Sequence, residues 1–263
     1  MSLVAVDAHV HLHGDGESAL RTAARNFVAG CGFMPDVGIL MLTESEGANR
    51  FAELRSRAAD RRNRAIEIAG DGCLWWMADP RLPLLLVAGR QIVTAEGLEV
   101  LALGTEDILL DGSPVAEVVR WCLRRRAVPV LPWGVGKWVG RRGQLVSDLL
   151  STANRNQLML GDNAGRPVLW KVPAFAEARR RGSKVLPGSD PLPVAGGEHS
   201  IGSYGFTMRL SFDRDDPRGS VLDAIRASDI EITPFGRPSR LHRQLFEQVA
   251  LRVRRPFRTR PAV

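Results

Sequence analysis

The chain has 263 residues, of which 44% are hydrophobic and 25% are charged, and its formal net charge is +7. These values are ordinary for a globular protein, and they exclude a disordered, collagen-like or disulfide-framework chain. No apolar run reaches the roughly 20 residues of a membrane helix, so we expect no membrane span.

Short apolar strands alternate with amphipathic helices along the chain, which indicates a mainly parallel sheet. We expect strands at Leu3–Val10, Val37–Leu42, Val128–Leu131, Gln157–Leu160, Lys184–Leu186, Phe206–Phe212 and Ile230–Thr233. We expect helices at Glu17–Ala29, Asn49–Arg62, Pro114–Arg126, Arg141–Leu150, Pro173–Arg181, Ser220–Ala227 and Arg240–Val253. A strand-rich section lies between these elements, at Ala65–Gly70, Cys73–Met77, Leu84–Val87, Gln91–Thr94 and Glu99–Leu103.

This order predicts an α/β fold, namely a single distorted TIM-like β/α barrel over residues 1–253. Such barrels commonly run to about 250 residues as one unit. The strand-rich section around residues 65–104 is expected to be an insertion. Residues 254–263 are rich in Arg and Pro and are expected to form a basic, disordered tail.

Composition also limits the compartment and the partners. Three cysteines without a C-x-x-C pair, and an N-terminus without a signal-peptide pattern, favour a reducing compartment and hence the cytoplasm. The positive charge permits anionic partners. Nucleic acid is one of them, but no zinc finger, helix-turn-helix or RNA-recognition signature accompanies the charge. The sequence does not indicate an oligomeric state.

Three of the five histidines lie at the end of the first expected strand, at His9, His11 and His13. Alternate residues of a strand point to the same face, so His9 and His11 project side by side. Two imidazoles on one strand can both bind one metal ion. The alternative is a histidine-rich loop that happens to follow a strand.

A carboxylate follows a late strand at Gly188-Ser189-Asp190. The C-terminal ends of barrel strands meet around one mouth, so Asp190 is expected to face His9 and His11. There it would bind the metal, orient a water molecule or accept its proton. The alternative is that Asp190 makes only a local turn with Pro191.

Three glycine-containing loops add candidates for binding or catalysis. Lys137 lies in Gly134-Val135-Gly136-Lys137, and Arg166 lies in Gly161–Pro167; either could neutralise an anion held by backbone amides. His199, in Gly196–Gly205, is a candidate acid, base or ligand. For each loop, an ordinary turn with a surface side chain is the alternative.

The chain resembles the PHP (polymerase and histidinol phosphatase) and amidohydrolase type of metal-dependent hydrolase. Asp7-Ala8-His9-Val10-His11 is similar to the PHP opening motif, and Gly188-Ser189-Asp190-Pro191-Leu192 is similar to Gly-Ser-Asp-Ala-His. Leu42-Thr43-Glu44-Ser45 stands where Thr-Asp-His is usual, which makes Glu44 a further candidate ligand. The resemblance implies phosphoester hydrolysis at a metal centre.

Several positions depart from that family. Gln91 stands where a bridging carboxylate is expected, and other ligand histidines are replaced by Ser45, Leu98, Trp133 and Leu192. Leu and Trp cannot bind a metal, which argues against a three-metal site. His9, His11 and Asp190 would suffice for one divalent ion, Zn²⁺ or Mn²⁺, helped by Glu44, Glu17 or Asp162.

Two functional hypotheses follow. The first is a metal-dependent hydrolase that acts on a phosphoester or another small anionic substrate through one metal-activated water. In it, Asp190 is base or ligand, and Lys137 or Arg166 holds the anionic group. The second is a catalytically inactive PHP-like barrel that serves in binding or scaffolding.

Overall fold

The computed structural model describes residues 1–13, 16–60, 65–79, 81–153, 157–194, 196–213 and 215–237. The predicted helix Arg240–Val253 and the predicted tail 254–263 lie outside these ranges. Among the described residues, no helix has both the length and the apolar character that crossing a bilayer requires.

Twelve strands and six α-helices make up the described fold. The strands are β1 (Ser2–Val10), β2 (Val37–Leu42), β3 (Ile66–Gly70), β4 (Cys73–Trp76), β5 (Leu84–Val87), β6 (Gly89–Val93), β7 (Glu99–Leu103), β8 (Val128–Pro132), β9 (Met159–Asn163), β10 (Val185–Gly188), β11 (Tyr204–Leu210) and β12 (Thr233–Gly236). The helices are α1 (Gly16–Cys31), α2 (Arg50–Ala59), α3 (Val115–Arg124), α4 (Arg141–Thr152), α5 (Pro173–Arg180) and α6 (Pro217–Arg226), with a short 3₁₀ helix, η1, at Gly197–Ser200. Up to residue 237, the predicted order of strands and helices is confirmed, although the last of these strands begins three residues later than expected.

The strands form two open sheets, so the predicted closed TIM-like barrel is wrong. One sheet has seven strands in the order β12-β11-β1-β2-β5-β4-β3, and the other has five in the order β10-β9-β8-β7-β6. The physical reason is that β1 has a hydrogen-bonded neighbour on each edge, parallel β2 and antiparallel β11. No edge of β1 is left for a ladder with β10, and β5 likewise occupies the outer edge of β2.

The strand-rich section is present but is not an insertion. β5 pairs with β2 in parallel inside the seven-stranded sheet, and β4 and β3 extend that sheet in antiparallel fashion. β6 and β7 instead form one edge of the five-stranded sheet. These five strands therefore belong to the two sheets themselves.

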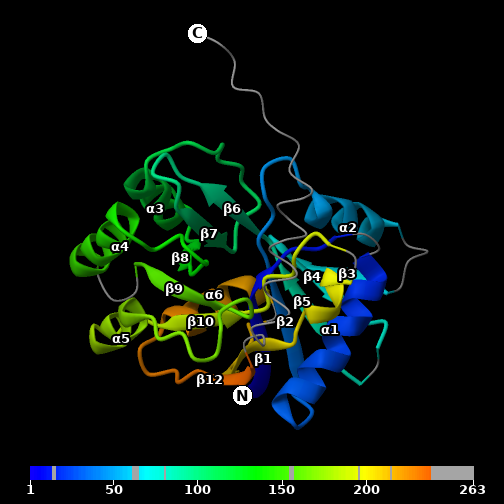
Figure 1. Cartoon of the computed structure of the whole chain (residues 1–263). Helices are drawn as coiled ribbons and strands as arrows, with labels where there is room; N and C mark the ends of the chain where they lie inside the picture. Colours follow the sequence, from blue (N-terminus) through cyan, green and yellow to red (C-terminus); the bar gives the residue numbers. More distant parts are fainter. Residues whose placement is uncertain are drawn as a thin grey trace.

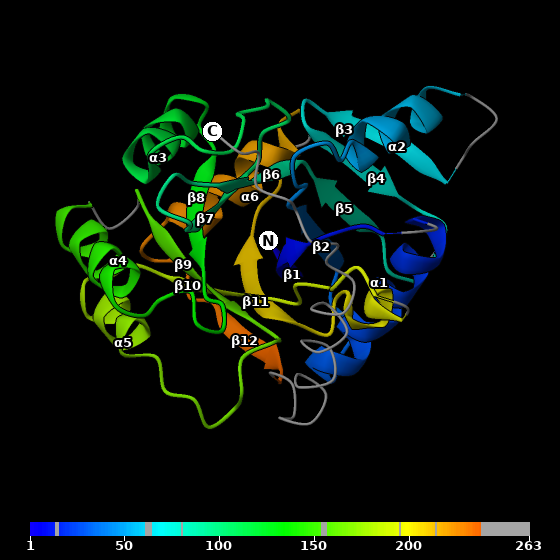
Figure 2. The same ribbon diagram turned by 45° about the horizontal axis from the view of Figure 1, so that its top comes forward.

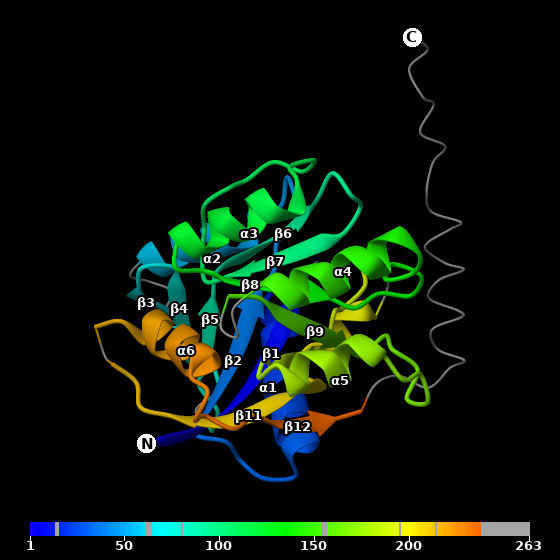
Figure 3. The same ribbon diagram turned by 90° about the vertical axis from the view of Figure 1, so that its left-hand side faces the viewer.

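The two sheets enclose an inner apolar layer and carry helices on their outer faces. Val6, Ile39, Leu101, Val130 and Leu186 are among the inner residues, and α6 contributes Val221 and Ile225 to the same cluster. The outer face of the seven-stranded sheet packs against α1 and α2, and that of the five-stranded sheet packs against α3, α4 and α5. Figure 1 shows these two groups of helices on opposite sides, and Figure 3 shows α6 beside β11.

Two seams join the sheets through isolated hydrogen bonds. At one seam, the backbone N–H of Asp190 donates to the carbonyl of His9 at 2.9 Å. At the other, Glu44 bridges to Arg90, and the N–H of Gln91 donates to the carbonyl of Glu44 at 2.9 Å. Figure 2 shows β1 and β2 in the middle of the molecule, between the outer helices. Residues from β1, β6 and the end of β10 are thereby brought close together.

Candidate metal centre

The two predicted histidines at the end of β1 do lie side by side. His9 is buried and His11 is half-buried. Their Nε2 atoms are 3.1 Å apart, and their ring centroids are 5.0 Å apart. The predicted placement of the pair is confirmed, although His11 lies one residue past the end of β1. His13 stacks on His11, but its Nε2 lies 3.3 Å from the carbonyl of Pro191.

Asp190 reaches the histidine pair from the end of β10. Its Oδ1 lies 3.4 Å from Nε2 of His9 and 3.8 Å from Nε2 of His11. The backbone of Asp190 has a φ of +47°, an uncommon conformation for a residue other than glycine. Such conformations cost free energy and persist where the surrounding structure holds them, as the bond from Asp190 N–H to His9 does here.

Gly188 permits this close approach of β10 to β1. A Cβ atom at Gly188 would lie 2.5 Å from the backbone nitrogen of His9. No side chain can be accommodated at that distance, so only glycine lets the following turn present Asp190 to the histidines.

His9, His11 and Asp190 form a group that could hold a metal ion. One ligand atom from each lies within 4.8 Å of the others, and no other such group of His, Cys, Asp and Glu occurs among the described residues. Two imidazole nitrogens and one carboxylate oxygen are donors that suit Zn²⁺ and other first-row divalent ions. The chemistry and the convergence of these side chains therefore fit a single ion.

Burial and neighbouring side chains shift the pKa values of His11 and Asp190. Burial and the neighbouring charge of His9 lower the pKa of His11 to about 4, so the imidazole is neutral at neutral pH. Burial alone would raise the pKa of Asp190, but His9, His11 and Lys137 outweigh it and hold that pKa below its usual value. A neutral imidazole and an ionised carboxylate are the forms that bind metals.

Asp7 holds the backbone on which His9 and Asp190 are carried, and no role was predicted for it. Its buried carboxylate accepts hydrogen bonds from the backbone N–H groups of His9 at 3.2 Å, Ser189 at 2.8 Å and Gly202 at 2.9 Å. Burial raises the pKa of Asp7 to about 6, and these three hydrogen bonds oppose the shift. Its signal in the sequence was its place in Asp7-Ala8-His9-Val10-His11, the segment that resembles the PHP opening motif.

Asn163 fixes the orientation of Asp190 and was also missed as a functional residue. Its Nδ2 donates to Oδ2 of Asp190 at 3.0 Å and to the carbonyl of Trp133 at 2.7 Å. Oδ1 of Asp190 is thereby left to face the histidines. Because Asn163 ends β9, next to β10, its position at a strand terminus was the signal that could have identified it.

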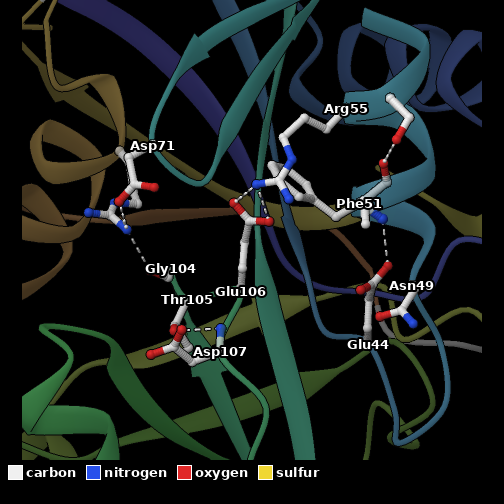
Figure 4. Close-up of polar contacts among 12 residues, drawn as sticks. Glu44, Asn49, Phe51, Arg55, Asp71, Gly104, Thr105, Glu106 and Asp107 are labelled. Atoms are coloured by element: carbon white, nitrogen blue, oxygen red, sulfur yellow. Dashed lines mark hydrogen bonds and ion pairs between the residues drawn. The ribbon is translucent and has the colours of Figure 1, made fainter. Parts of the chain in front are cut away.

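The structure places Glu44 outside the group of three. One carboxylate oxygen accepts from the N–H of Phe51 at 2.7 Å, in the first turn of α2, as Figure 4 shows. The other oxygen lies 3.1 Å from Nη1 of Arg90. Burial raises the pKa of Glu44, and its bonds to Phe51 and Arg90 oppose that shift. Both oxygens are thus engaged in holding α2 and the β2–β6 seam.

The remaining candidates border the group or lie apart from it. Nζ of Lys137 pairs with Glu99, and its charge acts on Asp190. The guanidinium of Arg166 binds both oxygens of Asp162, at 2.7 and 2.8 Å, and Tyr204 donates to Asp162 at 2.7 Å. No pattern in the sequence indicated Tyr204.

His199 is exposed in η1, and its carbonyl accepts from Asn26 at 2.8 Å. Glu17 lies on α1 and pairs with Arg21 at 2.7 Å. Neither belongs to the group formed by His9, His11 and Asp190.

Comparison with known proteins gives structural matches only. No family model and no curated protein matches the chain. The structure is similar to PsfC from Pseudomonas syringae PB-5123, with a TM-score of 0.62 and 14% identity over 96% of this chain and 99% of PsfC. It is also similar to the lesion-specific endonuclease PfuEndoQ from Pyrococcus furiosus, with a TM-score of 0.52 and 11% identity over 88% of this chain and 57% of that one.

A third neighbour is a two-domain protein from Bacteroides vulgatus ATCC 8482 that contains a predicted PHP-like metal-dependent phosphoesterase. Its TM-score is 0.45, and its identity is 14% over 90% of this chain and 65% of that one. At the identities of PsfC and PfuEndoQ, those two similarities show a common fold.

Proposed function

We propose that this protein is a metal-dependent hydrolase that uses one divalent ion, Zn²⁺ or Mn²⁺, to cleave a phosphoester or a related small anionic substrate. The observation that carries the proposal is the convergence of His9, His11 and Asp190, whose ligand atoms lie within 4.8 Å of one another. When bound, such an ion lowers the pKa of a water molecule towards neutrality and polarises a phosphoryl oxygen.

Different side chains would bind the ion, orient its ligand and bind the substrate. His9 and His11 supply imidazole nitrogens, and Asp190 supplies a carboxylate oxygen. Asn163 keeps the second oxygen of Asp190 turned away from the histidines. Lys137 would bind the anionic part of the substrate, because its charge already acts on Asp190 from the neighbouring loop. We assign Arg166 to bracing the loop after β9, since its guanidinium is held by Asp162.

A second candidate function is binding without catalysis. It is favoured by the engagement of the nearby carboxylates: Asp162 pairs with Arg166, and Glu44 pairs with Arg90. Among the residues that the structure describes at this centre, Asp190 is then the one carboxylate left to balance the charge of an ion, which gives a weaker centre than a carboxylate-rich one.

One experiment separates these functions. The protein, purified without chelator, is assayed for bound metal and for turnover of a panel of phosphomonoesters and phosphodiesters. We expect one ion per chain and turnover that chelation and Asp190→Asn both abolish. Asp223→Asn is the matched control, since Asp223 is exposed on α6. Metal uptake without turnover would favour the binding protein, and absence of metal uptake would contradict both the ion and the hydrolase.

A further inference from the structure

A fourth atom with a lone pair, Oε1 of Gln91, lies close to the ligand atoms of His9, His11 and Asp190. Nε2 of His9 lies 3.1 Å from Nε2 of His11, 3.1 Å from Oε1 of Gln91 and 3.4 Å from Oδ1 of Asp190. Gln91 comes from β6, an edge strand of the five-stranded sheet. It therefore reaches the histidines from a different strand than Asp190 does.

With Oε1 of Gln91 turned towards His9, as in the structure, the four converging atoms can receive protons only from the ring N–H groups of the two histidines. If Nε2 of His9 carries a proton, it can donate well to only one of its three neighbours. If it carries a lone pair, it faces the oxygen lone pairs of Gln91 and Asp190 at hydrogen-bond distance. His9 is buried and the other three side chains are half-buried. Acceptors that lack a donor in such surroundings are costly, whereas one cation among them would satisfy all four.

The separations also match a single coordination sphere. Four ligands at about 2.1 Å from a tetrahedral ion lie about 3.4 Å from one another. Nε2 of His9 lies 3.1 to 3.4 Å from the other three donor atoms, and Nε2 of His11 lies 3.8 Å from Oδ1 of Asp190. We infer that Oε1 of Gln91 is a fourth metal ligand, so that the centre is a mononuclear site of two nitrogens and two oxygens. This inference rests on the proposed function and deepens it.

The backbone holds Gln91 in the position that this role needs. Gln91 pairs with Leu101 of β7, and its own N–H donates to the carbonyl of Glu44 at 2.9 Å. A bound ion would then connect β1, the turn after β10, and β6, which are the elements at the two seams between the sheets.

The identity of Gln91 has a consequence for substrate charge. Two imidazoles and one amide are neutral ligands, and Asp190 contributes the one negative charge. A divalent ion in this set keeps a net charge of +1, where a glutamate in place of Gln91 would cancel it. The centre is therefore suited to an anionic substrate, and the amide is its weakest ligand.

Co²⁺ binding tests this inference without any activity assay. The visible absorption of Co²⁺ depends on the number and kind of its ligands. We expect Gln91→Leu to shift the Co²⁺ bands and to weaken Co²⁺ affinity about tenfold or more, by analogy with other residues that support metal sites. Gln91→Glu should shift the bands and strengthen affinity by a similar factor, because a carboxylate replaces a neutral amide.

Gln144→Leu is the matched control, because Gln144 is exposed on α4 and contacts Asp148. It should leave both the Co²⁺ spectrum and the Co²⁺ affinity unchanged. Circular dichroism of each variant in the presence of chelator checks the fold, and Gln91→Glu keeps the test valid if Gln91→Leu fails to fold. Wild-type spectra and affinity in both Gln91 variants would overturn the inference while leaving the proposed function intact. Failure of the wild type to bind Co²⁺, Zn²⁺ and Mn²⁺ would overturn both.

Discussion

The side-chain amide of Asn163 donates a hydrogen bond of 3.0 Å to Oδ2 of Asp190, and this bond turns Oδ1 of Asp190 towards the histidine pair. The same amide donates to the carbonyl of Trp133, so its orientation is fixed from two sides. A side chain that orients a ligand in this way commonly governs metal affinity almost as strongly as the ligand itself. The surroundings of Gly188, Arg166 and His11 lead to three further predictions, about stability and its dependence on pH.

Asn163→Leu is expected to weaken Zn²⁺ affinity about 10- to 100-fold, because Asp190 loses the bond that orients it. Competition with a chromophoric chelator measures the change. Asn49→Leu serves as the control, since Asn49 is exposed at the start of α2. Equal Zn²⁺ affinities for wild type and Asn163→Leu would show that Asn163 does not orient the ligand.

Gly188→Ala is expected to destabilise the protein and to impair metal uptake. The added methyl group would lie 2.5 Å from the backbone nitrogen of His9 and 2.6 Å from its Cβ. Crowding of this kind typically costs about 1–3 kcal/mol. Urea unfolding of the chelator-treated protein measures the loss. Gly16→Ala is the control, because the nearest atom to its Cβ would be 3.9 Å away. A Gly188→Ala protein as stable as wild type would contradict the close seam between β1 and β10.

Arg166→Met is expected to lower the free energy of unfolding by about 3–5 kcal/mol, because it leaves the buried carboxylate of Asp162 without its cation. Tyr204→Phe removes one hydrogen bond to the same carboxylate and is expected to cost about 1.5–3 kcal/mol. Arg50→Met, which breaks the exposed pair with Glu53, should cost less than about 1 kcal/mol. If urea unfolding gave similar losses of unfolding free energy for Arg166→Met and Arg50→Met, the pair of Arg166 with Asp162 would not stabilise the fold as a buried ion pair does.

The neutral state of His11 predicts how stability depends on pH in the absence of metal. The folded-state pKa is lowered from 6.5 to about 4, so the unfolded chain binds more protons between these values. His11 therefore favours folding at higher pH, and this contribution is lost as the pH falls from about 6.5 towards 4. Asp7 acts in the opposite sense, because its folded-state pKa of about 6 favours folding at lower pH over a similar range.

The comparison of wild type with His11→Gln isolates the histidine. Between pH 7.5 and 4.5, the stability of wild type relative to His11→Gln should fall by about 2–3 kcal/mol. Urea unfolding with chelator present at both pH values provides the measurement. A difference between the two proteins that does not change with pH would mean that His11 is not held in its neutral form.

The alternation of strands and helices was predictable because the period of apolar residues is a local property of the sequence. The number and closure of the sheets was not. Closure depends on which strand takes each edge of β1, and nothing local in Tyr204–Leu210 signals that this strand runs antiparallel beside β1. A chain with regular alternation favoured a barrel, and the pairing of β11 with β1 and of β5 with β2 produced two open sheets instead.

The site was predictable where it depends on strand parity and strand ends. His9 lies near the end of β1 and His11 just past it, and Asp190 follows a strand whose end lies beside them. Residues whose role depends on tertiary contacts were not predictable. Tyr204 comes from a strand far along the chain, and only the fold brings its hydroxyl to Asp162. Gln91 was identified in the sequence as a replaced ligand, but its contact with His9 was not predicted. The tail 254–263 stays a prediction.

The most direct test of the account is anomalous diffraction from crystals of the protein soaked in Zn²⁺. The account predicts one anomalous peak within about 2.2 Å of Nε2 of His9, Nε2 of His11 and Oδ1 of Asp190. Absence of a peak there, or Zn²⁺ bound only elsewhere on the protein, would contradict the metal centre on which the proposed hydrolase depends.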